Sequence, residues 1–208
     1  MVQEVPTARW RLAIEGMVRV SGLPPWSYRG QLYTGAAWFE GLVYQESVGE
    51  PRARRYEPHQ DRASRMDAPA DPDVCDHDDG ELEDDASYGL CQIMGYTARA
   101  LVGIDKVTLR GGKLVVADTG VYPPMRFGWL FRPLTNLSLG LRLLHEELQA
   151  VQRDVAKTVL SPGDEISRAL CRYNGGPTGD NLVDGDLRLR AYADRVAARA
   201  ALVRADRL

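Results

Sequence analysis

The 208-residue sequence has few cysteines, no excess of basic charge and no long apolar run, and each shortage excludes a class of protein. Three cysteines without a C-x-x-C pair argue against a disulfide scaffold and favour synthesis in a reducing compartment. A formal net charge of -3 is not the basic field that nucleic acid attracts, so we expect no nucleic-acid partner. No apolar stretch approaches the roughly 20 residues of a membrane span. The N-terminus MVQEVPTARW has no apolar signal core, so we expect neither a membrane span nor a signal peptide.

The hydrophobic residues, 44% of the chain, are spaced mostly for helices, which predicts a mainly α fold of the α+β class. The length fits a single domain, residues 1–208, with a sizeable core. Alternating residues on both sides of a Gly-Gly pair predict a small β-hairpin at 106–117. Residues 21–34, rich in Gly, Pro and aromatics, are expected to form a loop. The predicted helices are 8–20, 36–47, 89–101, 137–151, 161–174 and 187–203.

Polar residues that precede three of these helices are expected to cap them. Thr7 is the candidate cap of the first helix, and Thr135 or Asn136 that of the helix at 137–151. Ser161 opens an S-x-x-D box with Asp164, which is typical of a helix start. These assignments predict where the backbone N–H groups of each first turn find their acceptors.

The segment from Asp67 to Asp85 differs from the rest because it holds ten acidic residues and no Lys or Arg. Such a composition predicts a solvated insertion. The string CDHDD, which starts at Cys75, contains residue types that bind cations, but its spacing matches no known ligand pattern. We therefore favour a plain charged loop and expect no metal site.

Glu46 ends an apolar helical stripe, which is an unusual place for an acidic residue. By the i, i+3, i+4, i+7 rule it shares one helix face with Phe39, Leu42 and Val43. An apolar setting disfavours the ionised carboxylate, so we expect the pKa of Glu46 to be raised. This would suit a general acid that works near neutral pH.

Two further glutamates follow Glu46 in the stretch LVYQESVGEPRARRYEP, residues 42–58. Glu50 follows a glycine and is expected to be a solvated turn residue. Glu57 stands between a tyrosine and a proline. It is either a second functional carboxylate or a loop acid paired with Arg54 or Arg55, and the sequence leaves both open.

Four short motifs occur along the chain in a fixed order. They are QES at 45–47, YGLCQIM at 88–94, PLTNL at 133–137 and CRYNGGP at 171–177. Together they resemble the soluble lytic transglycosylase family, which shares its core with goose-type lysozyme. The string RYEP at 55–58 resembles a variant found in phage-type members. Cys91 and Arg172 depart from the family pattern, which has Met and a small residue at these positions, and this leaves the shape of the groove open.

The resemblance implies a lysozyme-like helical domain that acts on peptidoglycan glycan strands without a cofactor. Residues 1–34 would be an N-terminal helix and loop extension, 35–205 the catalytic core and 59–86 the acidic insertion. The implied reaction cuts the β-1,4 bond between N-acetylmuramic acid and N-acetylglucosamine and forms a 1,6-anhydro end. Glu46 would act first as the acid and then as the base toward the 6-hydroxyl of the same sugar.

Several further residues receive supporting roles from the same resemblance, each with a plain structural alternative. Ser47 would bond Glu46 or the sugar's acetamido group, or only its own helix end. Tyr173 would hold the Glu46 carboxyl, or only pack in the core. Glu57 would orient a water or tune Glu46. The implied substrate contacts are Tyr88, Gly89, Leu90, Gln92 and Asn174.

Three aromatic residues and two cysteines are also weighed for positions in the core. Tyr88, Trp26 and Tyr33 either stack on sugar faces or lie in the core. Cys91 and Cys171 are expected to be small core residues, because no histidine stands in a matching nucleophile motif.

The sequence leaves open two alternatives to a transglycosylase function. One is a hydrolytic muramidase that uses water, and the other is a virion protein that binds the wall without cleaving it. The missing signal peptide and the phage-like RYEP string imply synthesis in the cytoplasm and delivery to the wall by a phage virion or a lysis system. Virion proteins would then be additional partners.

Overall fold

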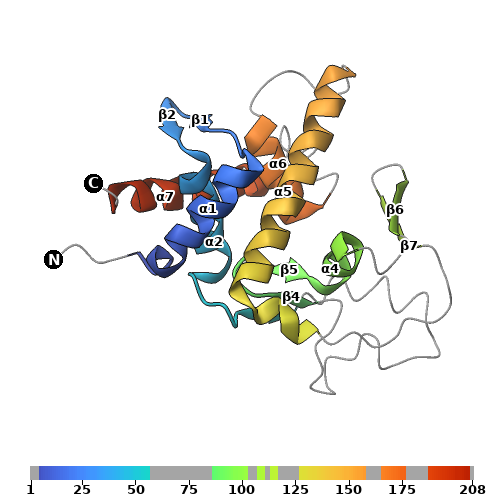
Figure 1. Cartoon of the computed structure of the whole chain (residues 1–208). Helices are drawn as coiled ribbons and strands as arrows, with labels where there is room; N and C mark the ends of the chain where they lie inside the picture. Colours follow the sequence, from blue (N-terminus) through green and yellow to red (C-terminus); the bar gives the residue numbers. More distant parts are fainter. Residues whose placement is uncertain are drawn as a thin grey trace. The chain divides into compact units, whose positions relative to one another are not determined.

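The computed structural model describes residues 5–56, 86–102, 107–110, 113–116, 127–157, 165–176 and 187–206. Within these ranges the protein is mainly α with small antiparallel sheets, which confirms the predicted fold class (Figure 1). The helices are η1 Ala8–Trp10, α1 Arg11–Ser21, α2 Gly35–Ser47, α4 Gly95–Val102, η3 Phe127–Phe131, α5 Pro133–Ala156, α6 Glu165–Gly175 and α7 Leu187–Ala205. The strands are β1 Trp26–Tyr28, β2 Gln31–Tyr33, β3 Arg54–Tyr56, β4 Ala86–Tyr88, β5 Ile93–Met94, β6 Val107–Arg110 and β7 Lys113–Val116.

The chain divides into two compact units. The first combines the described residues within 1–49 and 141–208, so it joins the N-terminal and C-terminal parts of the chain. The second contains those within 50–140. Among the described residues, no helix is long and apolar enough to cross a membrane.

Helix α2 is the central helix of the first unit. Thr34 caps its start by accepting a hydrogen bond from the backbone N–H of Ala37 at 3.2 Å. It ends at Ser47, and the next residue, Val48, adopts a left-handed conformation with φ 54. Its buried residues are Gly35, Ala37, Trp38, Phe39, Glu40, Gly41, Leu42, Val43 and Ser47. The single apolar stripe that the sequence predicted is therefore too narrow, because neighbours cover this helix on several sides.

Helices α2 and α7 approach each other closely at Gly41. A Cβ atom at this position would lie 2.7 Å from the backbone nitrogen of Ala200 and 2.9 Å from the carbonyl oxygen of Val196. Only a glycine permits this backbone contact. On α7, Tyr192, Val196 and Ala200 are buried.

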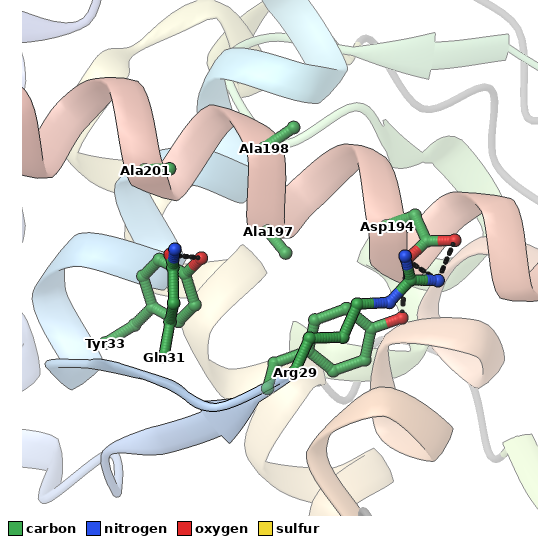
Figure 2. Close-up of a pocket in the computed structure, with 8 residues that line it drawn as sticks. Arg29, Gln31, Tyr33, Asp194, Ala197, Ala198 and Ala201 are labelled. Atoms are coloured by element: carbon green, nitrogen blue, oxygen red, sulfur yellow. Dashed lines mark hydrogen bonds and ion pairs between the residues drawn. The ribbon is translucent and has the colours of Figure 1, made fainter.

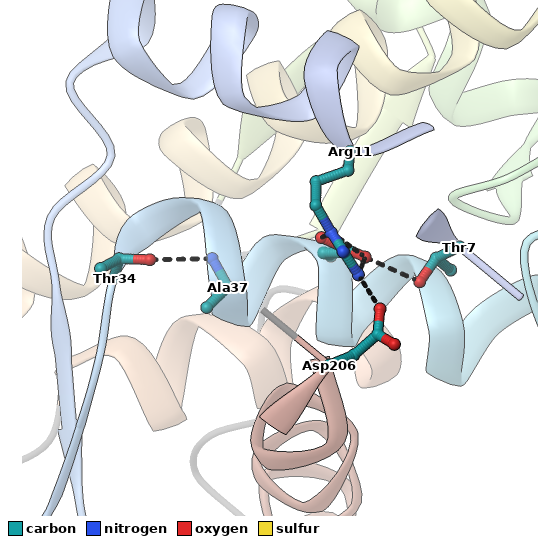
Figure 3. Close-up of polar contacts among 6 residues, drawn as sticks. Thr7, Arg11, Thr34, Ala37 and Asp206 are labelled. Atoms are coloured by element: carbon teal, nitrogen blue, oxygen red, sulfur yellow. Dashed lines mark hydrogen bonds and ion pairs between the residues drawn. The ribbon is translucent and has the colours of Figure 1, made fainter. Parts of the chain in front are cut away.

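A buried carboxylate ties the N-terminal segment to α2 (Figure 3). Glu40 is fully buried, and its Oε1 accepts hydrogen bonds from the Thr7 hydroxyl at 3.0 Å and from Nη2 of Arg11 at 3.2 Å. The same Arg11 nitrogen donates to Oδ2 of Asp206 at 2.7 Å. Burial lowers the pKa of Arg11, but hydrogen bonds to Glu40 and Asp206 outweigh it and raise the pKa. Thr7 occupies the N-cap position of η1, as predicted, but its hydroxyl makes no cap hydrogen bond and binds Glu40 instead.

Residues 21–34, expected to be a loop, contain a short hairpin instead. Strands β1 and β2 are antiparallel, with Trp26 opposite Tyr33. Arg29 and Gly30 form the turn with φ values of 48 and 77, as in the tight turns that match the twist of a hairpin. Asn-Gly is the usual signal for this turn, so Arg-Gly gave little indication of it.

Asp194 of α7 fixes this hairpin to the first unit. Its Oδ1 accepts a hydrogen bond from the Tyr28 hydroxyl at 2.7 Å, and Nη2 of Arg29 donates to its Oδ2 at 2.9 Å. Burial, reinforced by the hydrogen bond to Asp194, raises the pKa of Tyr28 to about 12. The phenol therefore remains a neutral donor at ordinary pH.

In the second unit, β3, β4 and β5 form a three-stranded antiparallel sheet. The predicted helix at 89–101 is correct only from Gly95 onward, because residues 89–92 form a turn and Ile93–Met94 is a strand. Gly89 and Gln92 have φ values of 75 and 47, which a right-handed helix does not allow. Strands β6 and β7 confirm the predicted Gly-Gly hairpin.

Helix α5 begins at Pro133 and not at the predicted cap residues. Thr135 and Asn136 lie inside its first turn, so the predicted cap at either residue is wrong. Proline suits a first helical position because the N–H that it lacks would have no partner there. Helix α6 ends at Gly175 and is followed by Gly176 with φ 77, in line with the predicted stop. The S-x-x-D box and residues 59–85 of the acidic insertion lie outside the described residues, whereas Ala86 is the first residue of β4.

Replacing Arg11 with Ala should lower the free energy of unfolding by about 3 kcal/mol, because it removes the cation that compensates the buried Glu40 carboxylate. Urea denaturation followed by far-UV circular dichroism measures this. Arg19→Ala, an exposed arginine of the same helix, should change it by less than about 0.5 kcal/mol. Adding Glu40→Leu to Arg11→Ala should recover part of the loss, since it removes the uncompensated charge. An Arg11→Ala protein as stable as the wild type would contradict this account.

Candidate functional site

Glu46 lies in the last turn of α2, and a tyrosine of α7 holds its carboxylate. The side chain of Glu46 is half-buried, whereas Tyr192 is 1% exposed. The Tyr192 hydroxyl donates to Oε1 of Glu46 at an oxygen–oxygen distance of 2.5 Å. The carboxyl is thus oriented by a rigid neighbour while part of it remains accessible.

The close packing of α2 on α7 explains how these two side chains meet. The contact at Gly41 brings the two backbones together, and Glu46 follows five residues later on the same helix. Helix α7 also carries cations close to this region. The Arg195 guanidinium lies 5.7 Å from the centre of the Tyr192 ring, and that of Arg199 lies 4.6 Å from the centre of the Tyr44 ring. Such cation–π contacts steady the rings that surround the site.

The hydroxyl of Ser47 caps the end of its own helix. It donates to the carbonyl oxygen of Val43 at 3.1 Å and accepts the backbone N–H of Gly49 at 3.2 Å. A serine hydroxyl has one proton, and here it is donated to Val43. The expected hydrogen bond from Ser47 to Glu46 is therefore replaced by the helix-end alternative.

Sequence reasoning missed Tyr192 as a partner of Glu46. It expected Tyr173 in this role, which stays a prediction. Tyr173 is half-buried on α6, and Asn174, an expected substrate contact, is exposed. A signal was present in the sequence, because a buried tyrosine hydroxyl usually requires a hydrogen-bond partner.

In the second unit, Asn136 holds the turn that contains the YGLCQIM motif. Its Oδ1 accepts the backbone N–H of Cys91 at 2.7 Å, and its Nδ2 donates to the carbonyl oxygen of Tyr88 at 2.8 Å. Gly89 makes this contact possible, since a Cβ there would lie 2.5 Å from Nδ2 of Asn136. The side chain expected to cap α5 thus connects the third motif to the second.

The side chain of Gln92 stabilises the same turn through three hydrogen bonds. Its Nε2 donates to the carbonyl oxygens of Gly89 at 2.9 Å and Ala53 at 3.2 Å. Its Oε1 accepts the hydroxyl proton of Ser87 at 3.0 Å. The amide that we expected to meet sugar hydroxyls is 8% exposed and is used for internal hydrogen bonds.

The other expected substrate contacts of this turn are also buried. Tyr88 and Leu90 have no exposed surface, and the ring of Tyr88 packs edge-on against Phe131 at 5.7 Å between centres. Trp26 and Tyr33 are buried in the first unit. For these three aromatic residues the core alternative is therefore correct, because buried rings present no face to a sugar.

The remaining predicted residues are placed as follows. Glu50 is exposed, and its Oε1 accepts the backbone N–H of Arg52 at 3.0 Å, which confirms a solvated turn residue. Cys91 and Cys171 are buried in the core, as predicted. Glu57 lies outside the described residues. No group of three potential metal ligands occurs within the described ranges.

No protein-family model matches the chain, and no curated protein matches its sequence. The resemblance to the lytic transglycosylases therefore rests on the four motifs alone. In the structure these motifs supply two elements: a carboxylate held at a helix end, and a buried turn held by an asparagine.

Replacing Asn136 with Ala should lower the free energy of unfolding by about 2–4 kcal/mol, because the Cys91 N–H and the Tyr88 carbonyl lose a buried partner. Chemical denaturation measures the loss. The neighbouring Thr135→Ala is the matched control and should change stability by less than about 0.5 kcal/mol. If Thr135→Ala were the more damaging change, helix capping would explain this segment better than the hydrogen bonds of Asn136.

Proposed function

We propose that this protein is a lytic transglycosylase that cleaves the β-1,4 bond between N-acetylmuramic acid and N-acetylglucosamine in peptidoglycan. The observation that carries the proposal is the half-buried carboxylate of Glu46, held at the end of α2 by the buried Tyr192 hydroxyl. The four motifs connect this carboxylate to peptidoglycan glycan strands as the substrate. The carbohydrate chemistry requires no metal or organic cofactor.

In the first step the Glu46 carboxyl donates its proton to the glycosidic oxygen. The bond from that oxygen to the anomeric carbon breaks, and N-acetylglucosamine leaves as an alcohol while positive charge develops on the muramic acid ring. Leu42 and Val43, one turn earlier on the same helix, are fully buried, so the helix face that ends at Glu46 is apolar. A carboxyl in such a setting suits the role of proton donor.

In the second step the ionised Glu46 acts as a base. It accepts the proton of the 6-hydroxyl of muramic acid as the oxygen of that hydroxyl attacks the anomeric carbon. A 1,6-anhydro ring closes, no water is consumed, and the carboxyl regains the proton that it donated. The same group therefore serves both steps.

Tyr192 is a positioning residue in this scheme. Its hydroxyl binds Oε1 of Glu46 and so fixes the plane of the carboxyl group. Because it is a hydrogen-bond donor, it favours the ionised carboxylate that the second step requires. The hydroxyl is carried by a buried residue of α7, so its position depends on the packing of α7 on α2.

The place of synthesis, the route to the wall and the partner proteins are part of the same proposal. Synthesis in the cytoplasm, delivery to the wall by a phage virion or lysis system, and virion proteins as partners are the implications of the phage-like RYEP string. Tail or lysis proteins would carry the chain to its substrate, and Glu46 would then act on the glycan.

Glu46→Gln should reduce the release of muropeptides from purified sacculi at least about a hundredfold, because the amide cannot donate the proton. Mass spectrometry of the released fragments measures both the rate and the chemistry. Glu50→Gln is the matched control, an exposed glutamate four residues further on, and should retain full activity. Full lytic activity of Glu46→Gln would refute the proposal.

The products of the wild-type reaction separate the proposed function from its alternatives. Anhydro ends support the transglycosylase. Reducing ends would instead assign a hydrolytic muramidase, with water in place of the 6-hydroxyl and Glu57 as the first residue to test. Binding to sacculi without any released fragment would identify a wall-binding virion protein.

Tyr192→Phe should lower the cleavage rate roughly tenfold, the effect of losing one charge-assisted hydrogen bond. The alkaline limb of the activity profile should move to higher pH, because the ionised carboxylate loses a donor. Circular dichroism should remain unchanged, since phenylalanine fills the same space. A lower rate with an unmoved pH profile would indicate a purely structural role for Tyr192.

A further inference from the structure

The β1–β2 hairpin and helix α7 border an open groove of about 370 Å³ that the chemistry at Glu46 does not use (Figure 2). Its floor consists of Ala197, Ala198 and Ala201, which lie on neighbouring turns of α7. These side chains end at Cβ, so the floor is shallow and apolar. Polar side chains stand at both ends of this floor, with the alanines between them.

One end of the groove is an Asp–Arg pair. Nη2 of Arg29 lies 2.7 Å from Oδ1 of Asp194, and the two side chains are 72% and 36% exposed. The Arg29 guanidinium also lies 5.5 Å from the centre of the Tyr28 ring, which steadies it. Because the two charges compensate each other, this end offers N–H donors and carboxylate acceptors side by side without a strong net field.

The other end consists of Gln31 and Tyr33. The Tyr33 hydroxyl donates to Oε1 of Gln31 at 2.6 Å, which orients the amide and directs its two N–H donors. Tyr33 is buried, so it provides a rigid support for the exposed Gln31. Both ends of the groove thus contain polar groups whose orientation is set by a tyrosine.

We propose that this groove binds one sugar unit of a glycan strand. A pyranose ring has hydroxyl and acetamido groups around its rim and apolar C–H groups on its face, which match polar ends and an alanine floor. A groove of this volume is at the lower end of the usual range for small-ligand sites, in keeping with a single ring. An anionic ligand would meet the Asp194 carboxylate, and a wholly apolar one would make no use of the exposed Arg29 and Gln31 side chains.

This inference rests on the proposed function, because the ligand is the strand that Glu46 would cut. The groove would hold a sugar of the strand apart from the reacting bond and so add affinity without taking part in chemistry. Two sources supply this sugar chemistry: a free oligosaccharide of N-acetylglucosamine, and the glycan strand of peptidoglycan with its muramic acid units.

The test measures binding by isothermal titration with Glu46→Gln protein, which leaves the probe uncut. The probes are N-acetylglucosamine tetramer and peptide-free glycan strands. Two variants are added separately: Ala198→Trp, which fills the groove from an exposed position, and Arg29→Asn, since asparagine tolerates the positive φ of residue 29. Each should weaken binding roughly tenfold. Arg19→Ala, which lies on α1 away from the groove lining, should bind like the parent.

The outcomes separate this inference from the function on which it rests. Weaker binding in both groove variants, with either probe, supports it, and the probe that binds identifies the sugar unit. Unchanged binding in both variants, or no binding of either probe at millimolar concentration, overturns it. Wild-type cleavage of sacculi would then leave the proposed function standing. Groove-dependent binding without cleavage would instead support the groove as a sugar-binding site and refute the proposed transglycosylase function.

Discussion

The ion pair of the buried Glu40 with Arg11 is the interaction on which the first unit depends most. An ionised carboxylate in a protein interior is costly unless a cation and hydrogen-bond donors surround it. Arg11 and Thr7 provide both, and Arg11 extends the contact to Asp206 at the end of α7. The N-terminal segment, the central helix and the C-terminal helix are therefore joined at one point. Gly41, the next residue, adds the backbone contact between α2 and α7.

Two glutamates on α2 illustrate how environment divides the roles of identical side chains. Glu40 is fully buried and paired with a cation, so it is a structural group that solvent does not reach. Glu46, less than two turns further on, is half-buried and bound by a neutral hydroxyl. Glu40 anchors α2 to its neighbours, and α2 in turn holds Glu46 at its C-terminal end. A reactive group held by a rigid element in this way needs little reorganisation before it acts.

The sequence predicted the features that depend on local patterns and missed those that depend on distant partners. The strongly periodic helices, the Gly-Gly hairpin and the buried cysteines were found because neighbouring residues determine them. The Arg-Gly hairpin was missed because its turn signal is weak, and Met94 was placed in a helix because the positive φ of Gln92 is not visible in its residue type. The role of Asn136 depends on a partner 45 residues away, and that of Tyr192 on one 146 residues away.

Helix α7 carries Tyr192 and Asp194 only two residues apart, which places their side chains about 200° apart around the helix axis. One hydroxyl reaches the end of α2, and the carboxylate reaches the hairpin. Any rotation of α7 about its axis that improved one contact would strain the other. The two contacts therefore fix the rotation of α7 about its own axis from opposite sides. This part of the helix resists twisting more than the same helix would without them.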